Sequence, residues 1–145
     1  MIPDLPATYV EHLVAPTGIG DVPDAHAAGE VGSMVGGLGV RMTLAYEAGG
    51  NGDARIALAA GRAFGSPAPL APLSWLAGAV IGQTWQEACT HTPEMILAAL
   101  SDGRSPVLPE PVARSAGYAV QALRRALGCP DAGAPADPTG EGILV

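Results

Sequence analysis

The chain has 145 residues, of which 48% are hydrophobic and 14% are charged, and its formal net charge is −7. This length is sufficient for one domain with a buried core. Nucleic-acid binding depends on the neutralisation of phosphates by Lys and Arg, so a chain with 7 basic and 14 acidic residues is not expected to bind nucleic acid.

The sequence favours a cytoplasmic location. It has no apolar run of about 18 residues, so no direct membrane span is expected. The N-terminal residues M-I-P-D-L-P lack the basic and apolar regions of a secretory signal. Cys89 and Cys129 are far apart and form no C-x-x-C pair, so we expect both cysteines to be reduced.

The first half of the chain predicts one short helix and a small sheet. Apolar residues at helical spacing predict a helix over 5–14, and the glycines and prolines of 15–32 predict a loop with little regular structure. His12 lies just before this loop and His26 lies within it, and we expect both to be ordinary polar residues. Alternating apolar residues, and a turn at Gly49–Asp53, predict an antiparallel sheet of three strands: around Val31–Val35, Val40–Tyr46 and Ile56–Phe64.

The stretch Phe64–Leu76 joins the last predicted strand to a buried helix. Gly65 permits a tight exit from the strand, and Ser66 stands exposed at the corner. Prolines at positions 67, 69 and 72 lack N–H groups and fix φ, so we expect residues 67–72 to be extended and the helix to begin near Pro72.

The second half of the chain predicts helices. Gly82 is a plausible C′ residue, and Thr84 with Glu87 forms a capping box. Thr92 is expected to cap a further short helix. An apolar stripe predicts a long helix over 112–127, with Arg114 and Tyr118 on its wetter face.

These signals predict an α+β fold, a small three-stranded antiparallel sheet with helices packed on one face. We expect residues 1–128 to form the domain and residues 129–145 to form a flexible tail rich in Pro and Gly.

From about Tyr9 to Leu127 the chain resembles the scaffold family of iron–sulphur cluster assembly, the IscU and NifU N-terminal domain. The resemblance is carried by the spacing of several blocks together: His12-x-x-x-Pro16-x-Gly18-x-Gly20, Phe64-Gly65, Ala71, Ser74, Gly82-x-Thr84-x-x-Glu87-Ala88 and Leu108-Pro109.

The resemblance implies a cluster or zinc site built from three cysteines and one aspartate, with a histidine beside the last cysteine. Those ligand positions fall on Gly36, Leu38, Ser66 and Ser115, and the histidine falls on Arg114. A lysine that the family's Hsp70-type chaperone recognises falls on Val112. Because serine is a poor ligand and arginine adds a permanent positive charge, we expect no metal site and no cofactor.

Other residues of the chain could supply a metal, catalytic or anion-binding site in place of the lost ligands. Cys89-x-His91 could hold a metal, although a partly buried free thiol and a surface histidine are favoured. Cys129 is expected to have no role in a metal site. Ser66 and Ser115 have no histidine assigned beside them, so a nucleophilic serine is not expected. Arg114 with Ser66 and Ser115 could bind a small anion, or Arg114 could pair with a local carboxylate.

The preferred hypothesis is a non-enzymatic family member that has lost the cluster ligands. It would act through protein partners as an accessory, regulatory or structural subunit linked to iron–sulphur proteins. Leu38, Trp75 and Trp85 are the candidate contact residues. The alternatives are a divergent scaffold or iron carrier using Cys89, His91 or a partner's cysteines, and an anion-binding module around Arg114.

Overall fold

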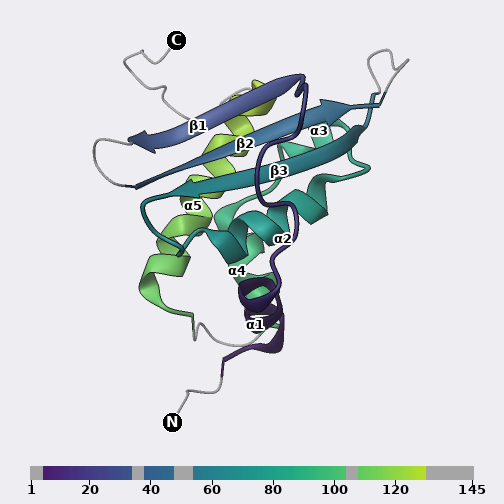
Figure 1. Cartoon of the computed structure of the whole chain (residues 1–145). Helices are drawn as coiled ribbons and strands as arrows, with labels where there is room; N and C mark the ends of the chain where they lie inside the picture. Colours follow the sequence, from purple (N-terminus) through teal and green to yellow (C-terminus); the bar gives the residue numbers. More distant parts are fainter. Residues whose placement is uncertain (1–4, 34–37, 48–53, 104–107, 130–145) are drawn as a thin grey trace.

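Three antiparallel strands in the order β1–β2–β3 form the sheet of the computed structural model, which describes residues 5–33, 38–47, 54–103 and 108–129 (Figure 1). The strands are β1 (Ala27–Ser33), β2 (Leu38–Tyr46) and β3 (Ile56–Phe64). The three-stranded prediction is confirmed. β1 begins at Ala27 rather than near Val31, and the predicted turn at Gly49–Asp53 falls outside the described residues.

Helices cover one face of this sheet, as predicted (Figure 1). In β2, Val40, Met42 and Leu44 alternate with residues of the other face and are fully buried against the helices. The helices of the described residues are α1 (Ala7–Val14), α2 (Leu70–Val80), α3 (Trp85–Ala88), α4 (Pro93–Leu100) and α5 (Glu110–Leu127).

The segment that follows α1 covers part of the opposite face. Gly61 of β3 donates its N–H to the Gly18 carbonyl and accepts from the Gly20 N–H, both at 2.8 Å. Further along, Val22 is buried with Ala45 and Ala60 in a second small cluster. A segment predicted to have little regular structure is therefore held by specific backbone hydrogen bonds.

The corner after β3 is tighter than expected. Residues 67–69 form a turn in which the Leu70 N–H donates to the Pro67 carbonyl at 3.0 Å, and α2 begins at Leu70. The prediction of an extended stretch over 67–72 is therefore wrong, although the helix does begin after Ser66. The φ that proline imposes suits a first helical turn as well as an extended chain, and Pro72 lies where the N–H would have no intrahelical partner.

The local capping signals are confirmed. Thr84 and Glu87 form the complete capping box of α3, and the Thr92 hydroxyl accepts from the Met95 N–H at the start of α4. Gly82 follows α2 with φ +89°, and Gly128 ends α5 in the left-handed region. α5 begins two residues before the predicted Val112.

Candidate functional site

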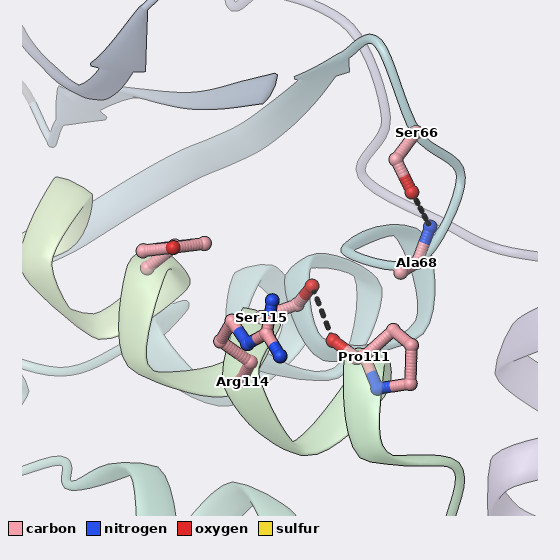
Figure 2. Close-up of a pocket in the computed structure, with 6 residues that line it drawn as sticks. Ser66, Ala68, Pro111, Arg114 and Ser115 are labelled. Carbon is pink, nitrogen blue, oxygen red and sulfur yellow. Dashed lines mark hydrogen bonds between the residues drawn. The ribbon is translucent and has the colours of Figure 1, made fainter. Parts of the chain in front are cut away.

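Ser66, Arg114 and Ser115, which the sequence places in a common site, do line one pocket of about 190 Å³ (Figure 2). Ala68, Pro111 and Tyr118 complete the lining. Four of these six residues come from the first turns of α5, where positions 111, 114, 115 and 118 share one face. The other two come from the turn between β3 and α2.

Both serine hydroxyls in this pocket form local hydrogen bonds. Ser66 Oγ accepts from the Ala68 N–H at 3.1 Å, a bond that helps to fix the turn before α2. The hydroxyl of Ser115, which is buried, donates to the Pro111 carbonyl at 2.8 Å (Figure 2). Neither serine forms a hydrogen bond with any of the three histidines, so no histidine is placed to activate either hydroxyl as a nucleophile.

Arg114 pairs with the carboxylate of Glu110, one turn earlier in α5, at 2.7 Å. The two side chains are 58% and 68% exposed, so this pair contributes only about 0.3–0.5 kcal/mol. The expectation of a local carboxylate partner for Arg114 is confirmed.

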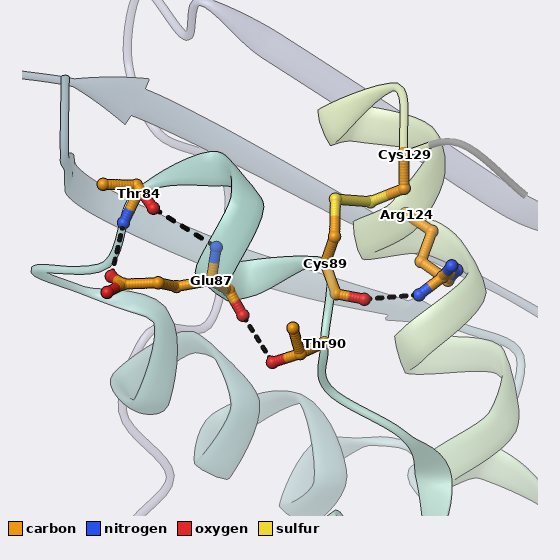
Figure 3. Close-up of a disulfide and its surroundings, with 6 residues drawn as sticks. All are labelled: Thr84, Glu87, Cys89, Thr90, Arg124 and Cys129. Carbon is orange, nitrogen blue, oxygen red and sulfur yellow. Dashed lines mark hydrogen bonds between the residues drawn. A yellow bond between two sulfur atoms is a disulfide. The ribbon is translucent and has the colours of Figure 1, made fainter. Parts of the chain in front are cut away.

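Cys89 and Cys129 are joined by a disulfide (Figure 3), so the expectation of reduced cysteines is wrong. Cys89 caps the end of α3, and Cys129 directly follows Gly128, which turns the chain at the end of α5. Arg124 donates to the Cys89 carbonyl at 2.5 Å in the same region. Cys129, the first residue assigned to the tail, is thus anchored to the domain.

His91 is only 5% exposed, so the expectation of a surface histidine is also wrong. Its Nε2 is 3.0 Å from Gln83 Oε1, and its Nδ1 is buried without a hydrogen-bond partner. The ring meets the Trp75 ring edge-on, and burial lowers the pKa of His91. Because the Cys89 sulfur is in a disulfide, Cys89-x-His91 does not form a ligand pair in this structure.

Sequence reasoning missed a contact between His12 and Ser74. His12 Nδ1 lies 2.7 Å from Ser74 Oγ, and this oxygen accepts a hydrogen bond from the Thr17 N–H at 2.8 Å. His12 and Ser74 are 62 positions apart in the sequence, so no local spacing could have indicated their contact. Ser74 is fully buried, so this serine–histidine contact ties α1 and the following loop to α2 and presents no exposed nucleophile.

The three predicted partner contacts differ in their surroundings. Trp75 is half-buried and packs against the core, whereas Trp85 is half-buried at the first position of α3. Leu38 begins β2, but its side chain lies outside what the structure describes. Their role in partner binding stays a prediction.

Comparison with models of known protein families identifies the family of this chain. Residues 7–129 match the model of the NifU-like N-terminal domain family. The chain belongs to this family. Its members are scaffolds that act with other proteins in iron–sulphur cluster assembly. No curated protein matches the chain.

Solved structures share the NifU-like fold at low sequence identity. One is a protein described as an iron–sulphur cluster assembly scaffold for the SUF system of Fervidobacterium islandicum AW-1, with TM-score 0.57, 17% identity and coverage of 83% of this chain and 94% of that one. A hypothetical protein gives TM-score 0.53, 17% identity and coverage of 85% and 96%. A nitrogen-fixing NifU-like protein from Brucella abortus gives TM-score 0.46, 19% identity and coverage of 83% and 81%. At these identities the first two structures show a likeness in the fold alone.

The residues at the positions that the resemblance assigns to NifU-like ligands do not fit iron or zinc. Ser66 and Ser115 supply hydroxyls, and Arg114 adds a permanent cation beside them. Gly36 lies outside the described residues. Within the described part of the chain, no group of three or more His, Cys, Asp or Glu could hold a metal ion.

Val112 occupies the position that the resemblance assigns to the chaperone-binding lysine. Its side chain is buried in the core and is not presented for recognition.

No helix in the described ranges is long and apolar enough to cross a membrane.

Proposed function

We propose that this protein is a NifU-like domain that has lost the cluster ligands and acts by binding other proteins. Its role would be non-catalytic, as an accessory, regulatory or structural subunit linked to iron–sulphur proteins.

The proposal rests on the state of the two cysteine thiols of the chain. The chain has two cysteines, and both are used in the Cys89–Cys129 disulfide, so no thiolate is available to an iron–sulphur cluster. The pocket that contains two of the assigned ligand positions carries hydroxyls and a guanidinium instead. A family member with these groups keeps the fold but lacks the chemistry of cluster assembly.

An apolar stripe on α1 supports a role in protein binding. Val10, Leu13 and Val14 are exposed and follow one another at the i, i+3 and i+4 spacing of a single helix face. Val14 is 75% exposed. Exposed apolar side chains that share one face are typical of interaction surfaces.

Metal analysis and the visible absorption spectrum of the purified protein test the loss of ligands. We expect the protein to stay colourless and free of stoichiometric iron or zinc after incubation with iron and sulfide, both with and without a thiol reductant. Stoichiometric metal in the reduced wild-type protein, lost in Cys89→Ala, would instead support a divergent scaffold that uses Cys89.

Capture of partners from the protein's own cells tests the binding role. We expect tagged wild-type protein to retain a partner at near-equal amounts, and Val14→Asp to lose it. Leu58→Asp is the matched control, because Leu58 is also exposed but lies on β3. Equal capture by both variants would exclude the α1 stripe, and the absence of any stoichiometric partner would count against the binding role.

A further inference from the structure

We propose that the pocket between α5 and the β3–α2 turn binds a small carboxylate with a short apolar chain. The site is lined by Ser66, Ala68, Pro111, Arg114, Ser115 and Tyr118. This inference goes beyond the proposed protein-binding role and holds whether or not that role is correct.

The polar groups left over in the pocket are hydrogen-bond donors. Ser66 uses its oxygen as an acceptor for the Ala68 N–H, so its O–H can still donate. The guanidinium of Arg114 has five N–H donors, and Glu110 engages its Nη2 group. The phenol of Tyr118 is half-buried and has no hydrogen-bond partner among the described residues. Spare donors beside a cation match an oxyanion.

Tyr118, rather than Ser115, provides the second hydroxyl that can donate a hydrogen bond to the ligand. The Ser115 hydroxyl already donates to the Pro111 carbonyl and is buried, so it lines the pocket without offering a proton. Tyr118 lies one turn further along α5, on the same face as Arg114 and Ser115. The ligand would thus be held by Arg114, Tyr118 and Ser66.

Charge selects a carboxylate over a phosphate. The pocket contains one cation, Glu110 places a negative charge beside it, and the whole chain carries −7. A phosphate group carries about 1.5 to 2 negative charges at neutral pH and would meet more repulsion than a single carboxylate. A guanidinium also binds a planar carboxylate in a bidentate manner.

The apolar walls and the small volume of the pocket favour a short apolar chain on the ligand. Ala68, Pro111 and the Tyr118 ring are apolar, and the volume of about 190 Å³ accommodates only a small group. A carboxylate on a short aliphatic chain would place its charged end on Arg114 and its chain against these walls. Such a group could be a free acid or the C-terminus of a peptide that ends in an apolar residue.

The ion pair between Arg114 and Glu110 shows how binding can occur. Both side chains are exposed, and an exposed pair one helical turn apart is weak. A ligand carboxylate can therefore take the remaining N–H groups of Arg114 or displace Glu110 without disturbing the fold.

Titration of the whole protein with propionate, followed by amide chemical shifts in NMR spectra, tests the proposal. We expect saturable changes in the millimolar range at Ser66, Ala68, Ser115 and Tyr118. Propionamide, which has the same shape without the charge, should cause none, and inorganic phosphate should bind more weakly. Arg114→Gln should weaken propionate binding about tenfold or more, and Tyr118→Phe less.

Arg55→Gln is the matched control, because Arg55 is also an exposed arginine paired with a glutamate but precedes β3 at its far end. It should bind propionate as the wild type does. Tripeptides with a free or amidated C-terminus distinguish a peptide ligand from a free acid: tighter binding of the free-carboxyl peptide than of propionate indicates a peptide. No saturable change, equal binding by Arg114→Gln, or phosphate binding as tight as propionate would overturn the proposal.

Discussion

Cys89 and Cys129 are bonded across 40 residues of sequence, and their disulfide ties the end of α5 to the connection between α3 and α4 (Figure 3). The chain turns at Gly128 and thereby directs Cys129 back towards the end of α3. This bond removes both thiols of the chain from metal chemistry and adds a constraint on the unfolded state.

Reduction of this disulfide should lower the free energy of unfolding. Closure of a loop of 40 residues restricts the unfolded chain, and stabilisation of about 2–4 kcal/mol is expected. Urea unfolding with and without a thiol reductant measures the difference. The Cys89→Ser/Cys129→Ser variant is the control, because its stability should match that of the reduced wild type and should not respond to reductant. A wild-type protein that is equally stable with and without reductant would contradict the expectation.

Gly29→Ala should destabilise the protein strongly because β1 packs closely on α5. A Cβ atom at Gly29 would lie 2.2 Å from the Ala122 carbonyl oxygen and 2.5 Å from the Ala126 nitrogen, and backbone atoms cannot move aside as a flexible side chain can. Overpacking of this kind costs about 1–3 kcal/mol or more. Thermal or urea unfolding measures it.

Gly78→Ala is the matched control for that substitution. Gly78 is exposed within α2, and a Cβ atom there would meet nothing within 4 Å. Alanine favours the helix over glycine by about 0.8–1 kcal/mol, so this variant should be more stable than the wild type. If Gly29→Ala were as stable as Gly78→Ala, the close contact between β1 and α5 would be wrong.

Acidification should destabilise the protein through His91. Burial lowers the pKa of this histidine in the folded state below its value in the unfolded chain, about 6.5, so the unfolded state takes up the proton first. Stability is therefore expected to fall as the pH drops below about 6.5. Unfolding free energies at pH 7.5 and 5.5 should differ less in His91→Gln than in the wild type. Equal pH dependence in the wild type and in His91→Gln would count against a buried neutral His91.

Local signals in the sequence predicted most of the fold. The capping box at Thr84 and Glu87 involves residues three positions apart, and the strand alternation of Val40, Met42 and Leu44 has a period of two. Such patterns are set by the geometry of one element and need no knowledge of its neighbours.

Contacts between distant residues could not be predicted in this way. The disulfide, the burial of His91 and the hydrogen bond between His12 and Ser74 depend on how elements meet, and no local spacing encodes them. The residues of the pocket could be predicted in part. The family resemblance placed Ser66, Arg114 and Ser115 together, but the role of Tyr118 became visible only from the free donors in the structure.

Restoring the family's ligands should create a zinc site. Ser66 and Ser115 line the same pocket, so thiols at these positions would converge there. The variant Gly36→Cys/Leu38→Asp/Ser66→Cys/Ser115→Cys supplies three thiolates and a carboxylate, a donor set that suits zinc. We expect it to bind one equivalent of zinc in competition with a chelator, whereas the wild type binds none. Adding Arg114→His should tighten binding further, because it removes a permanent cation and adds an imidazole. A folded variant that binds no zinc would show that these positions do not form the retained site of the family.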